Sequence, residues 1–454
     1  MRVRWMTCLM AALASLATAS GAAVARPAGQ GTEQSVEFRS GEVTLHGTVT
    51  TAAGATGQRP GIVLVHGAGP EKREKYQAEA RAMARAGFVV LSYDKRSTGY
   101  SLTQRSYARL ADDALAGVRL LSRRADVDPG RIGLWGFSEG GWVAPLAASG
   151  STQVSYVVLV GASGVPPARQ QAWYLKNMLR HHGVAGSLPQ TMAVDGTRVL
   201  ADAGLFPEAD YDPIPALRRV RQPVLAMWGN DQQSPPAESA RAIEKALHDG
   251  GNTDVTLRFF PHADHKLRAS PDGFQRGGQP APGYVDTMAS WVAGQAHRTN
   301  DPLPQQARQS RALAPLAGYQ ATGAQVAALL FMTGTFAAYL LGEVIRRLRG
   351  RPSASRAPRW LAATGLVTVL GFLGYFGFVT MALTPGPVLG DRPVCWLVLQ
   401  LLAVGTAVAT LATAVGWWRA RTSVRGVARI RLGLLGLAGA VFVPWALFWG
   451  LMAP

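Results

Sequence analysis

The sequence predicts an α/β fold, a mostly parallel sheet with helices on both faces, followed by an all-α membrane segment. Between about residues 35 and 298, short apolar runs alternate with amphipathic stretches of helical periodicity, which is the pattern of a parallel sheet covered by helices. From residue 321 to residue 452, four long and nearly uncharged runs follow one another. Hydrophobic residues make up 48% of the 454 residues and charged ones 16%, which is more apolar than an ordinary soluble protein.

The strands of the predicted sheet are apolar runs bounded by turn residues. Residues 43–50 are expected to form an early antiparallel strand. Further strands are expected at residues 61–66, 88–93, 131–136, 156–161, 223–228 and 255–260. Helices are expected at residues 76–86, 107–123, 140–148, 236–248 and 284–296. The interval from about 165 to 220 is too long for a simple crossover, so we expect a small cap there.

Each of the four apolar runs is long enough to cross a bilayer, because about 20 apolar residues with a rise of about 1.5 Å each span the hydrocarbon core. The runs cover about residues 321–345, 360–383, 394–418 and 432–452. We therefore expect a membrane domain at 320–454, preceded by a polar, proline-bearing linker at 299–319. Buried helices of a large soluble core are the alternative.

The net charge of +18 lies mainly beside the membrane runs, which argues against nucleic-acid binding. The loops after the first and third runs hold eleven arginines, whereas the loop at 384–393 has no net charge. These arginines are Arg346, Arg347, Arg349, Arg351, Arg356, Arg359, Arg419, Arg421, Arg425, Arg429 and Arg431. By the positive-inside rule both arginine loops lie in the cytoplasm, and the chain before residue 321 lies outside it. The lipid bilayer is thus the expected partner, with no nucleic acid.

The N-terminus supports the same orientation. Two arginines precede an apolar stretch at 5–24, and small residues follow up to Ala25, as in a secretory signal peptide. We expect a signal peptide at 1–25, with an uncleaved signal anchor as the alternative. Either form places the following domain, residues 35–298, on the extracytoplasmic side of the cytoplasmic membrane.

A Gly-x-Ser-x-Gly motif lies between a predicted strand and a predicted helix. A serine on such a sharp turn adopts strained backbone angles, so small residues are needed two positions before it and two after it. Gly136 and Gly140 occupy these positions around Ser138. The chain has 51 glycines, so the motif alone is weak evidence. Its place between strand and helix makes Ser138 a candidate nucleophile.

Four motifs lie, in order, at the carboxyl ends of predicted strands. They are His66-Gly67-Ala68-Gly69, then Asp94-Lys95-Arg96, then the turn at Ser138, and finally two late loops with Asp231 and His265. This order resembles the α/β-hydrolase superfamily, in particular its dienelactone hydrolase, prolyl oligopeptidase and serine aminopeptidase branches. The resemblance covers roughly residues 35–298 and implies the α/β-hydrolase fold with a small cap at about 165–220.

The resemblance implies a catalytic triad, with Ser138 as nucleophile, His265 as base and Asp231 as the acid that orients the base. His265 ends the stretch Phe-Pro-His-Ala-Asp-His, which resembles the family's Phe-Pro-Gly-Ala-Asp-His. His262 falls on the glycine position and is the rival base. Asp231 follows its glycine with one intervening residue, where the family often has two. A turn or helix-capping aspartate is the alternative for this residue.

The resemblance also implies an oxyanion hole made by the backbone N–H groups of Ala68 and Glu139. His66 and the glycines on either side of Ala68 would support this loop, because a side chain there would block the substrate. The Glu139 side chain is expected to be solvated in the first helical turn. Hydrogen bonds of Asp94 and Arg96 are expected to brace the site without direct chemistry.

These observations predict a membrane-anchored, extracytoplasmic serine hydrolase acting on a small-molecule or peptide acyl substrate. It would cleave an ester, thioester or amide through an acyl-Ser138 intermediate, with carboxylesterase activity favoured and peptidase activity as the alternative. No cofactor or metal is expected, because no Cys or His cluster has metal spacing and no phosphate-binding loop is present. The alternative from another class is a membrane transport or signalling protein with a hydrolase-like outer sensor domain.

Overall fold

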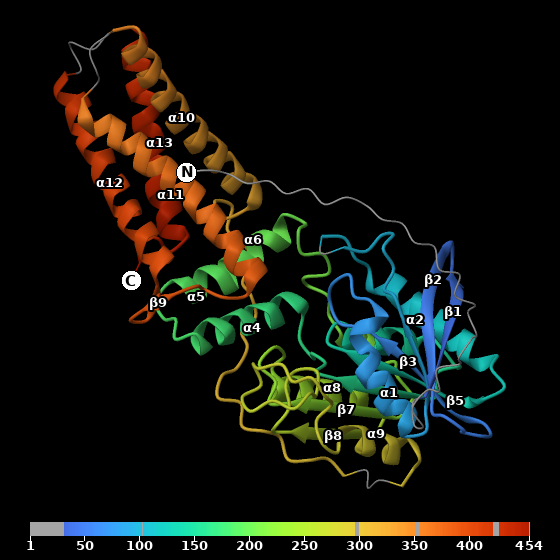
Figure 1. The fold of residues 1–454 in the computed structure, drawn as a ribbon. Coiled ribbons are helices and arrows are strands. Elements are labelled where there is room, and N and C mark those ends of the chain that lie inside the picture. Colours follow the sequence, from blue (N-terminus) through green and yellow to red (C-terminus); the bar gives the residue numbers. More distant parts are fainter. Residues whose placement is uncertain (1–30, 102, 296–298, 351–354, 421–425, 454) are drawn as a thin grey trace, which may run out of the picture. The chain divides into compact units, whose positions relative to one another are not determined.

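The computed structural model describes residues 31–453 except 102, 296–298, 351–354 and 421–425. The expected signal peptide at 1–25 lies outside the described residues. An eight-stranded sheet with helices on both faces is followed by four long helices (Figure 1). This arrangement confirms the predicted fold class.

The sheet has the strand order β1-β2-β4-β3-β5-β6-β7-β8. Its strands are β1 (Thr32–Ser40), β2 (Val43–Thr51), β3 (Arg59–Val65), β4 (Val89–Tyr93), β5 (Val127–Phe137), β6 (Tyr156–Val160), β7 (Val224–Gly229) and β8 (Val255–Phe260). β2 pairs antiparallel with β1 and β4, and all later neighbours are parallel. Every predicted strand is present. Sequence analysis missed β1, because most of its side chains are exposed and it forms no apolar run.

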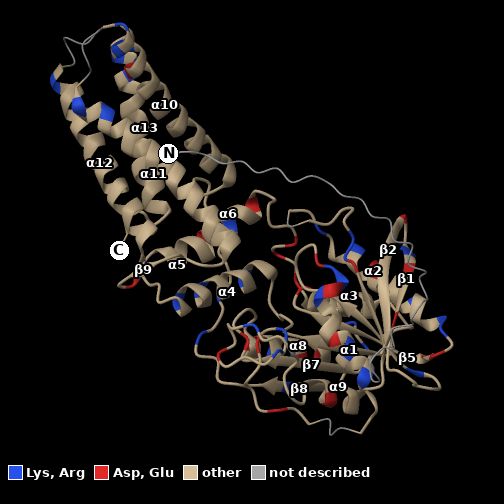
Figure 2. Ribbon diagram, viewed as in Figure 1, with Lys and Arg blue, Asp and Glu red and all other residues tan. Residues whose placement is uncertain are grey.

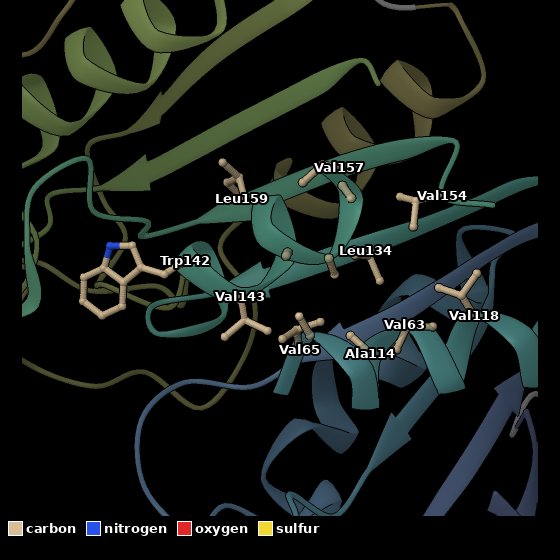
Figure 3. Close-up of a cluster of buried hydrophobic side chains, with 14 of the residues drawn as sticks. Val63, Val65, Ala114, Val118, Leu134, Trp142, Val143, Val154, Val157 and Leu159 are labelled. Carbon is tan, nitrogen blue, oxygen red and sulfur yellow. The ribbon is translucent and has the colours of Figure 1, made fainter. Parts of the chain in front are cut away.

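Two hydrophobic cores lie on the two faces of the sheet. Along β3, Ile62 and Leu64 belong to one core and Val63 and Val65 to the other, as the alternation of side chains in a strand requires. The helices of the first core are α1 (Gln77–Arg85) and α9 (Tyr284–Val292), and those of the second are α2 (Tyr107–Ser122), α3 (Gly140–Ser149) and α8 (Pro236–Asp249). Figure 3 shows the second core where strand valines meet Val143 of α3. This packing holds the carboxyl ends of the parallel strands in fixed positions.

The interval expected to form the cap is helical. It contains α4 (Pro167–His181), α5 (Leu188–Gln190), a π-helical turn (Thr191–Gly196), α6 (Thr197–Asp202) and α7 (Ile214–Leu217). Gln170 of α4 donates hydrogen bonds from its side-chain amide to the Gln233 carbonyl at 3.2 Å and to the Ser234 hydroxyl at 3.1 Å. The cap is therefore tied directly to the loop that follows β7.

The segment expected as a linker runs beside the edge strand β8. The Asn300 side chain accepts from the Leu257 N–H at 2.9 Å, and the Asp301 carboxylate accepts from the Phe259 N–H at 3.0 Å. Exposed strand edges readily pair with other chains. These two side chains satisfy edge N–H groups of β8, so this segment is attached to the sheet along part of its length.

The four long helices are α10 (Thr322–Leu348), α11 (Arg356–Ala382), α12 (Val394–Ala420) and α13 (Val427–Phe448). All four are long and apolar enough to cross a membrane. α10 packs against α11 and α13, and α12 packs against the same two helices. Arginines gather at the end where α10 and α12 finish and α11 and α13 begin (Figure 2).

The cap and the four long helices share one hydrophobic core. Leu179 of α4 is buried in the same cluster as Phe372 and Trp449. Two hydrogen bonds reinforce the contact, because the Ser187 hydroxyl donates to the Gly450 carbonyl at 2.9 Å and the Thr191 hydroxyl to the Trp449 carbonyl at 3.0 Å. The long helices therefore bury one side of the cap.

Candidate active site

Ser138 stands on a strained turn between β5 and α3. Its φ of +53° lies in the left-handed region, which residues other than glycine rarely adopt. A Cβ atom on Gly136 would meet the Gly140 carbonyl oxygen, and one on Gly140 would meet the Val65 carbonyl oxygen. Both glycines are therefore required for the turn, which has the geometry of a nucleophile elbow.

The structure brings Asp231 and His265 together. His265 Nδ1 lies 2.7 Å from Asp231 Oδ2, and both side chains are buried. Asp231 Oδ1 accepts the N–H groups of Gln233 and Ser234 at 2.7 and 2.9 Å. The Asp231 carboxylate therefore stabilises a tight turn with one oxygen and contacts the His265 imidazole with the other, although only one residue separates Asp231 from its glycine. This geometry holds the ring in one orientation.

His262, the rival base, is exposed and makes no side-chain hydrogen bond within the described residues. The close approach of His265 depends instead on Gly161, a residue that sequence analysis did not single out. Gly161 has a φ of +55°, and a Cβ atom there would lie 2.8 Å from His265 Nδ1. The only sequence signal is its position at the end of the predicted strand 156–161.

Ser138 and His265 line one cavity of about 870 Å³, together with Gly67, Ala68 and Phe137. His265 Nε2 is buried and has no hydrogen-bond partner among the described residues. It is the ring nitrogen on the side away from Asp231. Its lone pair is thus available to a group that enters the cavity or to the Ser138 hydroxyl.

Basic side chains outnumber acidic ones in the lining of this cavity. The basic residues are Lys75, Arg81, Arg85, Lys266, Arg268 and Arg276, and the acidic ones are Glu71, Glu74 and Asp264. Burial raises the pKa of Asp264, whose carboxylate accepts the Lys266 and Arg268 N–H groups at 2.9 Å. Lys75, Arg81, Lys266 and Arg268 form ion pairs with carboxylates at 2.7–3.3 Å, so Arg85 and Arg276, which form no such pair within the described residues, supply most of the positive charge of the lining.

His66 supports the loop that follows β3 as a neutral aromatic ring. It is buried and stacks on Tyr76, with ring centroids 4.0 Å apart and planes 7° apart. Burial, followed by the nearby charge of Lys95, holds the pKa of His66 well below its usual value. The Tyr76 hydroxyl accepts the Gly67 N–H at 3.0 Å, so this stack is attached directly to the loop.

The expectation of a solvated Glu139 is wrong. The carboxylate is fully buried and forms ion pairs at 2.8 Å with both Lys95 and Arg105. The Tyr100 hydroxyl also donates to it at 2.9 Å. A buried carboxylate is stable when cations and hydrogen bonds satisfy both oxygens, and sequence alone does not show these distant partners.

The side chains of Asp94 and Arg96 fix the loop after β4 through hydrogen bonds, but Lys95 is the residue of this loop that contacts the site. Asp94 accepts a hydrogen bond from the Arg73 N–H at 3.1 Å, and the Arg96 guanidinium donates two hydrogen bonds to the Asp113 carboxylate at 2.7 and 2.6 Å. Lys95 between them reaches the Gly67 carbonyl. Sequence analysis missed this role, although Lys95 lies inside a motif that it had identified.

The two predicted oxyanion donors lie on separate segments. The Ala68 and Glu139 N–H groups donate no hydrogen bond within the described part of the chain. Both remain available to a ligand. In the described ranges, no group of three or more His, Cys, Asp or Glu side chains is placed to hold a metal ion.

Comparison with known proteins gives a family match and several similar chains. Residues 57–214 match the family described as serine aminopeptidase, S33. Esterase EstD of Thermotoga maritima is 23% identical over 55% of this chain and 65% of its own length. An uncharacterized 31.7 kDa protein of Escherichia coli is 26% identical over 46% of this chain and 82% of its own. Pyrococcus horikoshii acylaminoacyl peptidase is similar with a TM-score of 0.39 and 22% identity, over 52% of this chain and 38% of that one.

The chain thus spans less than two thirds of EstD and of the peptidase. The segment matched by the family contains Ser138 but ends before Asp231 and His265. Strand order, the strained turn at Ser138 and this match lead to one conclusion. The chain has a domain with the α/β-hydrolase fold, and residues 57–214 within it resemble the S33 serine aminopeptidases.

Proposed function

We propose that this chain is a serine hydrolase that cleaves an ester, thioester or amide through an acyl-Ser138 intermediate. Carboxylic esters are the favoured substrates, and peptides are the alternative. The observation that carries the proposal is the Asp231–His265 contact at 2.7 Å beside a cavity that Ser138 also lines. The similarity to an esterase supports it, and the match to an aminopeptidase family keeps the peptide alternative. Hydrolysis of an activated ester by the purified protein and by Ser138→Ala tests it.

In the proposed reaction, His265 Nε2 removes the hydroxyl proton as Ser138 Oγ attacks the acyl carbon. The Ala68 and Glu139 N–H groups stabilise the negative charge that develops on the acyl oxygen. His265 then protonates the leaving group as its bond to the acyl carbon breaks. A water molecule, deprotonated by the same nitrogen, releases the acid and regenerates Ser138. Asp231 stabilises the positively charged imidazole in both steps.

We infer that the hydrolase domain lies on the extracytoplasmic side of the membrane. The arginine-rich end of the four long helices would face the cytoplasm by the positive-inside rule. The cap contacts the opposite end, where the Ala185 N–H donates to the Asp391 carbonyl at 2.8 Å, in the loop between α11 and α12. These positions support a domain held beside the outer surface of the bilayer.

Cysteine labelling tests this orientation. A cysteine at exposed Gln153 is expected to react with a membrane-impermeant maleimide in intact spheroplasts, because the label reaches only the outer side. A cysteine at exposed Ser355, before α11, is expected to react only after the membrane is permeabilised. Both variants need Cys395→Ala as the background, because Cys395 is a free, exposed thiol. The reverse labelling pattern would place the hydrolase domain in the cytoplasm.

The charge of the cavity predicts a preference for anionic substrates. We expect kcat/KM for 4-acetoxybenzoate to exceed that for its neutral methyl ester by roughly 2- to 5-fold at low salt, since a partly exposed ion pair contributes up to about 1 kcal/mol. The advantage should shrink at high ionic strength. Arg276→Gln should reduce it, whereas Arg39→Gln on exposed β1 should leave it unchanged. Equal rates for both esters at low salt would refute an anionic preference.

A further inference from the structure

The peptide group between Gly67 and Ala68 is held from one side by Lys95. Lys95 Nζ donates a hydrogen bond to the Gly67 carbonyl oxygen. The Ala68 N–H belongs to the same planar peptide group and points away from that carbonyl, because the peptide bond is trans. Fixing the direction of the Gly67 carbonyl therefore fixes the direction of the Ala68 N–H.

Lys95 also contacts the segment that carries the second donor. Its Nζ lies 2.8 Å from Glu139 Oε1, and Arg105 holds the other carboxylate oxygen at 2.8 Å. The Tyr100 hydroxyl bridges the same two segments, because it donates to Glu139 Oε1 and accepts the Gly69 N–H, both at 2.9 Å. One buried polar cluster thus contacts the loop after β3 and the residue after Ser138.

The polar cluster matters because residues 66–69 and 138–139 carry the two proposed oxyanion donors. Apart from this cluster, the two segments are joined only indirectly. No backbone hydrogen bond links residues 66–69 with residues 138–139 in the described structure. An oxyanion donor contributes about 10²- to 10³-fold to kcat, and a misplacement of about 1 Å costs about 10²-fold. Beyond the last pair of β3 and β5, Val65 with Gly136, the two segments are bridged by side chains, and Lys95 and Tyr100 each contact both of them.

We propose that Lys95 is a positioning residue that holds the Ala68 and Glu139 N–H groups in register through the Gly67 carbonyl and the Glu139 carboxylate. This inference rests on the proposed hydrolase function. A purely structural ion pair is the competing explanation. It predicts lower stability after Lys95 is removed but no specific loss of transition-state stabilisation.

The chain offers a matched control in the next residue. Arg96 also forms a buried pair, with Asp113 at 2.6 Å, but has no hydrogen bond to residues 67–69 or to Glu139 within the described structure. On p-nitrophenyl acetate, Lys95→Met is expected to lower kcat about 10²-fold with KM changed by less than about threefold. Arg96→Met is expected to lower the melting temperature but to retain kcat per folded molecule. Lys95→Arg, which keeps charge and donor, is expected to restore part of the lost kcat.

Inhibition by phenylboronic acid gives a second readout, because its tetrahedral adduct with Ser138 needs the same two donors. The inhibition constant of Lys95→Met should rise by about the factor by which kcat falls. Should Lys95→Met fail to fold, Tyr100→Phe removes hydrogen bonds to both segments without leaving a buried charge. It is expected to lower kcat about tenfold, again with KM little changed.

Three results would overturn the inference: unchanged kcat in Lys95→Met, an effect confined to KM, or equal kcat losses in Lys95→Met and Arg96→Met. The same variants distinguish failure of the proposed hydrolase function from failure of the positioning role. If Ser138→Ala still hydrolyses the ester at the rate of the unmodified protein, the hydrolase assignment itself fails. If Ser138→Ala is inactive and Lys95→Met is fully active, only the positioning role is lost.

Discussion

Ser138→Ala is expected to lower kcat for p-nitrophenyl acetate by about 10⁶-fold, the loss that follows removal of a catalytic serine in a triad enzyme. Labelling by a fluorophosphonate probe should disappear with it. The change removes a single oxygen from the cavity, and the turn keeps its two glycines, so folding should be preserved. Activity and labelling are measured on the detergent-solubilised full chain.

Ser163→Ala is a suitable control for this experiment. Ser163 is also a buried serine, and its hydroxyl donates to the Val165 carbonyl at 3.2 Å. Because it does not line the cavity, its loss should leave turnover and labelling within about twofold of the unmodified protein, the range of ordinary stability effects. Persistent labelling of Ser138→Ala would show that another residue is the nucleophile.

Asp231→Asn is expected to lower kcat about 10⁴-fold while leaving the fold intact. The side-chain oxygen of asparagine can still accept the Gln233 and Ser234 N–H groups, now held at 2.7 and 2.9 Å. The amide NH₂ then faces His265 Nδ1, which must accept a hydrogen bond rather than donate one. The proton of neutral His265 is forced onto Nε2, so this nitrogen cannot take the proton of Ser138.

Asp264→Asn controls for the loss of a nearby buried carboxylate. Its carboxylate accepts backbone N–H groups in the same loop and does not contact a His265 ring nitrogen. We expect a loss of less than about tenfold in kcat, measured between pH 7 and 9. Equal losses in Asp231→Asn and Asp264→Asn would argue against Asp231 as the residue that orients the base.

Local patterns explain how much of the fold could be predicted. The buried parallel strands are continuous apolar runs, and the predicted turn at Ser138 needs only its flanking glycines and the strand before it. β1 was missed because a strand at the exposed edge of a sheet has no apolar run, and its backbone pairing with β2 leaves no pattern in the sequence.

In the candidate site, family motifs predict Ser138, Asp231 and His265 individually, and the structure places His265 Nδ1 2.7 Å from Asp231 Oδ2. The supporting residues could not be predicted, because their effect depends on distances across the fold. Glu139 was expected to be solvated for this reason. Its partner Lys95 lies 44 residues away in the chain, and no local spacing relates the two.

The sequence by itself determined the α/β class, the four apolar helices and the turn at Ser138, because each follows from the order of residues along a short segment. Tertiary structure alone decided which histidine meets Asp231, how Glu139 is neutralised and what the cap packs against. The hydrogen bond from the Thr191 hydroxyl to the Trp449 carbonyl, for example, joins residues that are 258 positions apart. Such contacts depend on the three-dimensional packing of distant segments, which hydrophobic periodicity and motif spacing do not encode.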